Sequence, residues 1–237
     1  MQDQHIASAF DRDLEGLQAN IMRMGGLVEA AILESTRALA DRDVELAETV
    51  RAADAAIDEL ERFINEECAR VIAMRQPMST DLRIILAVMK VASALERIAD
   101  YAKNIAKRTT VLAETGPING SDQALKRMAR EVETMLKDTL DAFIQRDPEL
   151  AGDVRDRDHS VDQMYNALFR EFLTHMMEDP RNITACMHLH FIAKNIERMG
   201  DHTTNIAEEV IYLVTGEHPD DPRPKGDTAP GIERSTA

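Results

Sequence analysis

The feature that most constrains this chain is an internal repeat. The segment ERIADYAKNIAK, which begins at Glu96, reappears as ERMGDHTTNIAE from Glu197, with Glu, Arg, Asp, Asn, Ile and Ala in identical places. Further upstream, RDVELAETVRAADAAID from Arg42 aligns with RDPELAGDVRDRDHSVD from Arg146. Self-similarity that keeps its order at a spacing of about a hundred residues indicates two copies of one structural unit.

Proline and glycine divide the chain into segments with helical periodicity. Breaks fall at residues 41 to 43, 76 to 78 and 116 to 120, at Asp147-Pro148, at Asp179-Pro180, and from Gly216 onward. The two Asp-Pro pairs are typical of a helix N-cap followed by proline in the first turn, where the missing N–H costs nothing. Six long helices in two copies predict an all-α fold of two tandem, internally duplicated three-helix bundles.

The domain boundaries follow from these breaks. We expect the first three-helix bundle in residues 1–116 and the second in residues 117–216. Residues 217–237, EHPDDPRPKGDTAPGIERSTA, are polar and rich in proline. A segment with so little to bury is predicted to be a disordered tail.

Charge and hydropathy restrict where the chain works and what it binds. The formal net charge of -15 opposes nucleic-acid binding, which depends on clustered Lys and Arg. No apolar run reaches the roughly 18 residues of a membrane-spanning helix, and the acidic N-terminus is unlike a secretory signal. We therefore expect a cytoplasmic protein that binds cations or protein partners, without nucleic acid and without direct membrane insertion.

Two sets of acidic pairs recur with the repeat. Glu96 and Asp100 are one helical turn apart, opposite the apolar seam that includes Leu95 and Ile98, so they are expected on the outward face with Asn104 one turn further. If the preceding helix runs antiparallel, its own acidic pair faces them across a shallow groove, and the second copy repeats the arrangement. The candidate metal ligands are Asp54, Asp58, Glu96, Asp100, Asp158, Asp162, Glu197 and Asp201.

Carboxylates of this kind suit hard cations such as Mg²⁺, Mn²⁺, Ca²⁺ or iron. A bound cation would also relieve the repulsion within each pair. The competing interpretation is that these carboxylates are only a solvated helix face.

Catalytic motifs are absent from the sequence. It contains no GxxxxGK[ST], no GxGxxG and no GxSxG segment. Carboxylates on an open face give a metal little leverage for chemistry, because water is not excluded there. We expect no enzymatic activity, with a metal-dependent phosphoesterase and a metal-binding storage protein as the alternatives that use the same carboxylates.

The paired ERIADYAKNI and ERMGDHTTNI segments, MRQPMSTDLR from Met74 and IMRMGGLVE from Ile21 together resemble the PhoU family, from about residue 5 to residue 215. The resemblance implies a homodimer or larger homo-oligomer that acts beside the phosphate importer's ATPase and a phosphate-sensing histidine kinase. Such a protein would repress the phosphate-starvation response and restrain uptake when phosphate is plentiful. It also implies cation binding, with Fe, Zn, Mg or Mn, through the eight carboxylates above.

The sequence departs from the family pattern at one turn. In the second copy, MEDPRNI replaces MRQPMSTDLR. A contact made by Arg75 or Arg83 is therefore not expected twice.

Overall fold

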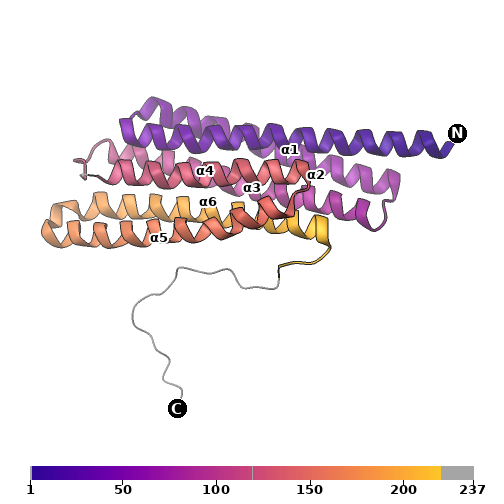
Figure 1. Cartoon of the computed structure of the whole chain (residues 1–237). Helices are drawn as coiled ribbons and strands as arrows, with labels where there is room; N and C mark the ends of the chain where they lie inside the picture. Colours follow the sequence, from indigo (N-terminus) through magenta and orange to yellow (C-terminus); the bar gives the residue numbers. More distant parts are fainter. Residues whose placement is uncertain (1, 119, 220–237) are drawn as a thin grey trace, which may run out of the picture.

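The computed structural model describes residues 2–118 and 120–219, which form six long α-helices and one short 3₁₀ helix. Their axes run side by side, and the N-terminal end of α1 extends beyond the other helices (Figure 1). The helices are α1 (Gln2–Asp41), α2 (Val44–Arg75), α3 (Thr80–Leu112), α4 (Ser121–Gln145), α5 (Pro148–Glu178), η1 (Pro180–Asn182) and α6 (Ile183–Thr215). The described part of the chain contains no strand, so the prediction of an all-α fold with six long helices is confirmed.

The helix ends lie where local chemistry predicts them. Asp147 caps α5, because its side chain accepts hydrogen bonds from the backbone N–H groups of Glu149 and Leu150, and Pro148 occupies the first turn. Asp179 accepts from the N–H of Arg181 in the same way and starts η1. Between α2 and α3 the chain turns at Gln76, whose φ of 50° places it in the left-handed region.

The helices pack as two three-helix bundles. In the first bundle α1, α2 and α3 each contact the other two, and α4, α5 and α6 do the same in the second bundle. The bundles meet along α3 with α6 and along α1 with α4. Close approach of α1 and α4 depends on Gly25, because a Cβ atom there would overlap the side chain of Leu140.

The two bundles share one apolar core. A single cluster of buried residues runs from Ile21 in α1 through Val91 in α3 to Leu136 in α4 and Ile196 in α6. Burial at about 25 cal/mol per Å² of apolar surface makes this shared core the main source of stability. The boundary predicted near residue 116 stays a prediction, and most of the predicted tail lies outside the described residues.

No helix in the described part of the chain combines the length and the apolar character that a membrane crossing requires.

Candidate functional site

The eight candidate ligands lie in two sets of four, one where α2 packs against α3 and one where α5 packs against α6. We call these the first groove, between α2 and α3, and the second groove, between α5 and α6. The second groove forms a pocket of about 190 Å³. It is lined by Asp158, Asp162, Tyr165, Asn166, Lys194, Glu197 and Asp201.

Glu197 is the most enclosed carboxylate of the second groove. Its side chain is 12% exposed, and its Oε2 atom is buried without a hydrogen-bond partner. Burial raises the pKa of Glu197; Lys194 opposes the shift, and the charges of Asp201 and Asp162 add to it. A buried carboxylate oxygen without a partner favours a bound proton or cation at this position.

Lys194 is the internal counterion of the second groove. Its Nζ donates a hydrogen bond to Glu197 Oε1 at 2.6 Å and lies 5.1 Å from the centroid of the Tyr165 ring. Burial alone would lower the pKa of Lys194, but the hydrogen bond and charge of Glu197 raise it. The lysine therefore stays charged and satisfies one oxygen of Glu197, while the other oxygen is buried without a hydrogen-bond partner.

The first groove uses a lysine from a different position. Lys103 Nζ donates to Asp54 Oδ2 and lies 3.7 Å from Asp100 Oδ1. Asp54 is 5% exposed and Asp100 is 36% exposed, so the lysine neutralises the deep end of the groove.

The remaining carboxylates of the first groove carry uncompensated repulsion. Burial raises the pKa of Asp58, and the charge of Asp54 raises it further against the opposing effect of Lys103. Burial also raises the pKa of Glu96, and Asp100 and Asp58 add to that shift. The charges of these carboxylates interact across the groove, so they form one electrostatic cluster. Its members are Asp54, Asp58, Glu96 and Asp100.

The structure places the acidic pairs beside one another, but at different depths. An outward face was expected for Glu96, Asp100, Glu197 and Asp201, and the side chains of Glu96 and Asp100 are 26% and 36% exposed. Glu197 is largely enclosed, because α5 packs against the face of α6 that carries it. Asn104, expected on the same stripe, instead lines a separate groove that also contains His188.

Several groove residues were missed by the sequence analysis. Lys103 follows Asp100 by three residues and Lys194 precedes Glu197 by three, so the helical i,i+3 spacing could have revealed both. Tyr165 and Asn166 line the second groove from the next turns of α5 and carry no comparable signal.

The donor set of both grooves fits a hard cation. The ligands are carboxylates, and Asn166 also lines the second groove. Within residues 2–118 and 120–219, however, no three His, Cys, Asp or Glu side chains converge closely enough to hold a metal ion as they stand. Binding would draw the carboxylates inward, and the orphaned oxygen of Glu197 makes the second groove the better fit.

Comparison with known proteins identifies the family. The model of the PhoU domain matches the chain twice, over residues 21–109 and 125–210. The chain belongs to the PhoU family. The two matches fall in the two bundles, one in each, as expected for a duplicated unit in this family.

PhoU relatives span almost the full chain. The chain is similar to the phosphate-specific transport system accessory protein PhoU homolog of Rhizobium meliloti (strain 1021), with 47% identity over 96% of each protein. The homolog of the same name from Caulobacter vibrioides (strain NA1000 / CB15N) is 45% identical over 94% of this chain and 97% of its own length.

Solved PhoU structures have the same fold. The crystal structure of PhoU from Pseudomonas aeruginosa superimposes with a TM-score of 0.85 at 41% identity, covering 88% of this chain and all of that one. The PhoU structure from Streptococcus pneumoniae gives a TM-score of 0.83 at 33% identity, covering 89% of this chain and 99% of that one.

Proposed function

We propose that this chain is a non-enzymatic accessory regulator of phosphate transport. One observation carries the proposal. Relatives named as phosphate-specific transport system accessory proteins match this chain over nearly its whole length and over nearly the whole of their own length. The residues that differ are therefore expected to tune the shared role.

As a regulator, the chain acts as an adaptor between the ATPase of the phosphate importer and the phosphate-sensing histidine kinase. Its strongly acidic surface suits docking onto basic patches of these proteins from the cytoplasmic side of the membrane. In plentiful phosphate the adaptor holds the kinase in its repressing state and restrains uptake.

Deletion of the gene tests the regulatory role. In rich phosphate, the deletion strain should express phosphate-starvation genes that the parent strain keeps silent. Unchanged expression would contradict the proposal. A pull-down of the tagged chain from cells grown in high and in low phosphate then tests the adaptor step, because both the ATPase and the kinase should be recovered in a phosphate-dependent ratio.

The two grooves bind divalent or ferric cations that stabilise the adaptor. The support is the partnerless oxygen of Glu197 and the raised pKa values of Asp58 and Glu96, which burial raises first and neighbouring carboxylates raise further. A bound cation supplies the positive charge that these carboxylates lack, and no chemical step is assigned to it.

Thermal unfolding of metal-free protein titrated with Mn²⁺ tests the cation sites. At 100 times the dissociation constant, one site adds about 2.7 kcal/mol, which corresponds to a rise of roughly 5 to 10 °C in Tm for a chain of this size. The double variant Asp100→Ala with Asp201→Ala, one residue from each groove, should lose most of this rise.

The control for that experiment is Glu59→Ala with Asp156→Ala, which removes two exposed carboxylates from α2 and α5 outside the grooves. It should keep the full rise in Tm. Equal rises in all three proteins would exclude the grooves as the metal sites.

A screen of phosphate esters with Mn²⁺ tests the enzymatic alternative. Turnover that Glu96→Ala abolishes would contradict the non-enzymatic role.

A further inference from the structure

A third groove, of about 410 Å³, is lined by cationic and neutral residues only. We call it the basic groove. Most of its lining comes from the C-terminal half of α3, with one residue from α2 and one from α6. The lining residues are Arg51, Asn104, Lys107, Arg108, Thr110, Val111 and His188. A pocket without any carboxylate in its lining is unexpected in a chain with a net charge of -15.

Arg108 lies at the inner wall of the basic groove without an acidic partner. Its Nη1 is 3.3 Å from Nδ1 of His188, and its guanidinium stacks 4.4 Å from the centroid of the Phe191 ring. Burial lowers the pKa of Arg108, and no nearby carboxylate opposes that shift. A partly buried guanidinium that lacks a counter-charge in the folded chain provides charged donors for an anion.

The neighbours of Arg108 add to the positive potential. Lys107 is exposed beside it, and Arg51 reaches the groove from α2, where it also pairs with the exposed Glu48 at 2.5 Å. Burial and the charge of Arg108 lower the pKa of His188. The amide of Asn104 is a neutral group that can donate hydrogen bonds to the same ligand.

The second bundle provides an internal comparison for this groove. The repeat aligns Lys107 and Arg108 with Glu208 and Glu209, while Arg51 aligns with Arg155. In the second bundle, therefore, the chain itself supplies negative charge at these two positions.

Both glutamates of the second bundle are paired. Arg155 Nε donates to Glu208 Oε1 at 3.3 Å, and Lys90 Nζ donates to Glu209 Oε1 at 2.7 Å. In the first bundle the equivalent positions, Lys107 and Arg108, are both cationic, and Arg51 pairs with Glu48 instead, so Arg108 has no counter-charge of this kind.

We infer that the basic groove binds a phosphate-class oxyanion, either free orthophosphate or the phosphate chain of a nucleotide. Arg108 and Lys107 supply the charged donors, and the amide of Asn104 supplies a neutral one. The volume exceeds what one tetrahedral anion needs, so the groove leaves space for a ligand larger than orthophosphate. This inference does not depend on the regulatory role or on cation binding, because it concerns a different groove and can be measured on the isolated protein.

Isothermal titration calorimetry on the full chain tests the inference, with orthophosphate in one arm and ATP in the other. Both arms use metal-free protein in the presence of a chelator, and they are repeated in the Asp100→Ala with Asp201→Ala background. These conditions prevent a metal in the acidic grooves from recruiting phosphate. Saturable binding of orthophosphate identifies the free ion, and binding of ATP alone identifies a nucleotide.

Three variants locate the binding to the basic groove. Arg108→Gln should weaken it at least about tenfold, the loss expected for one charge-assisted hydrogen bond to a charged ligand. Lys107→Gln, at an exposed position that leaves packing intact, should weaken it as well. Lys107→Glu with Arg108→Glu copies the second bundle and should abolish binding.

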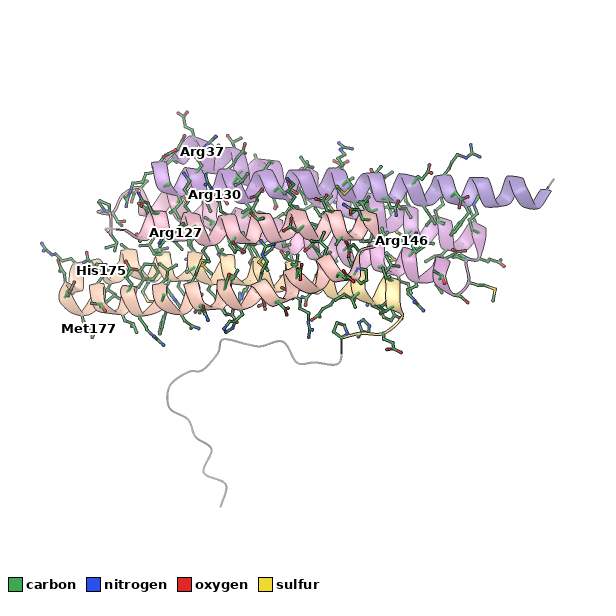
Figure 2. All side chains as sticks on the ribbon, viewed as in Figure 1. Arg37, Arg127, Arg130, Arg146, His175 and Met177 are labelled. Carbon is green, nitrogen blue, oxygen red and sulfur yellow. The ribbon has the colours of Figure 1, made fainter. Side chains whose placement is uncertain are left out.

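Arg37→Gln is the matched control. It removes the same charge from an exposed position on α1, where the side chain projects from the edge of the bundle (Figure 2). It should bind as the parent chain does. The ring protons of His188 provide a direct readout, since their NMR signals should shift with the anion and not with chloride.

The inference is overturned if neither anion binds at millimolar concentration, or if Lys107→Gln and the double glutamate variant bind as tightly as the parent chain. Equal weakening by Arg37→Gln would also overturn it, because the effect would then reflect net charge.

Discussion

A Cβ atom at Gly200 would lie 3.2 Å from Oδ1 of Asp158, so α6 approaches α5 here more closely than a side chain comfortably permits. The repeat places Ala99 at the equivalent position of α3. The second groove is therefore built around a glycine contact that the first groove lacks. Gly200 sets the distance between carboxylates contributed by different helices.

Gly200→Ala tests this contact. Alanine in place of glycine inside a helix gains up to about 1 kcal/mol in the free energy of unfolding, but displacement of Asp158 should consume part of that gain. Because ligands have to be held within about 0.5 Å of their working geometry, we expect metal affinity in the second groove to fall by roughly tenfold. Calorimetric titration with Mn²⁺ measures the affinity, and urea unfolding measures the stability.

Gly26→Ala is the matched control, because Gly26 is exposed within α1 and a Cβ atom there would meet nothing within 4 Å. It should gain the full increment, about 1 kcal/mol, with unchanged metal affinity. If both variants behave alike, the Gly200 contact does not shape the groove.

Lys103→Met should destabilise the metal-free protein by about 1 to 2 kcal/mol. The variant leaves Asp54 buried without its cationic partner. The loss in the free energy of unfolding is smaller than for a fully buried ion pair, because Lys103 is itself 41% exposed. Addition of Mn²⁺ should restore more stability to this variant than to the parent chain, since the ion replaces the lost charge. Urea unfolding with and without the metal measures both effects.

The control for Lys103→Met is the double variant with Asp54→Asn. Removal of the buried charge should recover part of the lost stability, and a double variant that is less stable than Lys103→Met would contradict the pairing.

The metal-free protein should lose stability as pH rises from mildly acidic to neutral, because Glu197 loses its proton over this range. Burial raises the pKa of Glu197 above the ordinary value of 4.5, so the folded state holds this proton more tightly than the unfolded chain does. Its stabilising contribution is therefore complete below pH 4.5 and is lost as pH rises through the folded-state pKa.

Thermal unfolding of the parent chain and of Glu197→Gln between pH 4.5 and 8 isolates this contribution. The parent chain should lose stability relative to the variant as pH rises, and saturating metal should reduce the difference because the ion takes the place of the proton. Parallel curves without metal would contradict the assignment.

Asp147→Ala should cost about 1 to 2 kcal/mol in the free energy of unfolding, because the side chain satisfies two backbone N–H groups at the start of α5. Asp147→Asn should retain most of the stability, since the amide oxygen accepts the same hydrogen bonds. Denaturant unfolding monitored by circular dichroism distinguishes the two, and equal losses would indicate that charge, rather than the cap, is responsible.

The sequence by itself determined the helices and their duplication. Helix ends depend on neighbours a few residues apart, so Asp147-Pro148, Asp179-Pro180 and Gly216 marked them without knowledge of the tertiary structure. The spacing of Glu96 with Asp100 and of Glu197 with Asp201 likewise placed each pair on one helix face. The assignment of candidate ligands to two sets followed from that local geometry.

Only the tertiary structure decided how deep those carboxylates lie and which cations meet them. Lys103 and Lys194 enter their grooves from positions that do not correspond in the repeat, so duplication could not predict either pairing. Depth and partnership depend on the distance and relative rotation of neighbouring helices, which the packing at Gly200 and Ala99 sets. The local sequence pattern determines the direction in which a side chain leaves its own helix. Its burial depends on which residues of the adjacent helix pack against it.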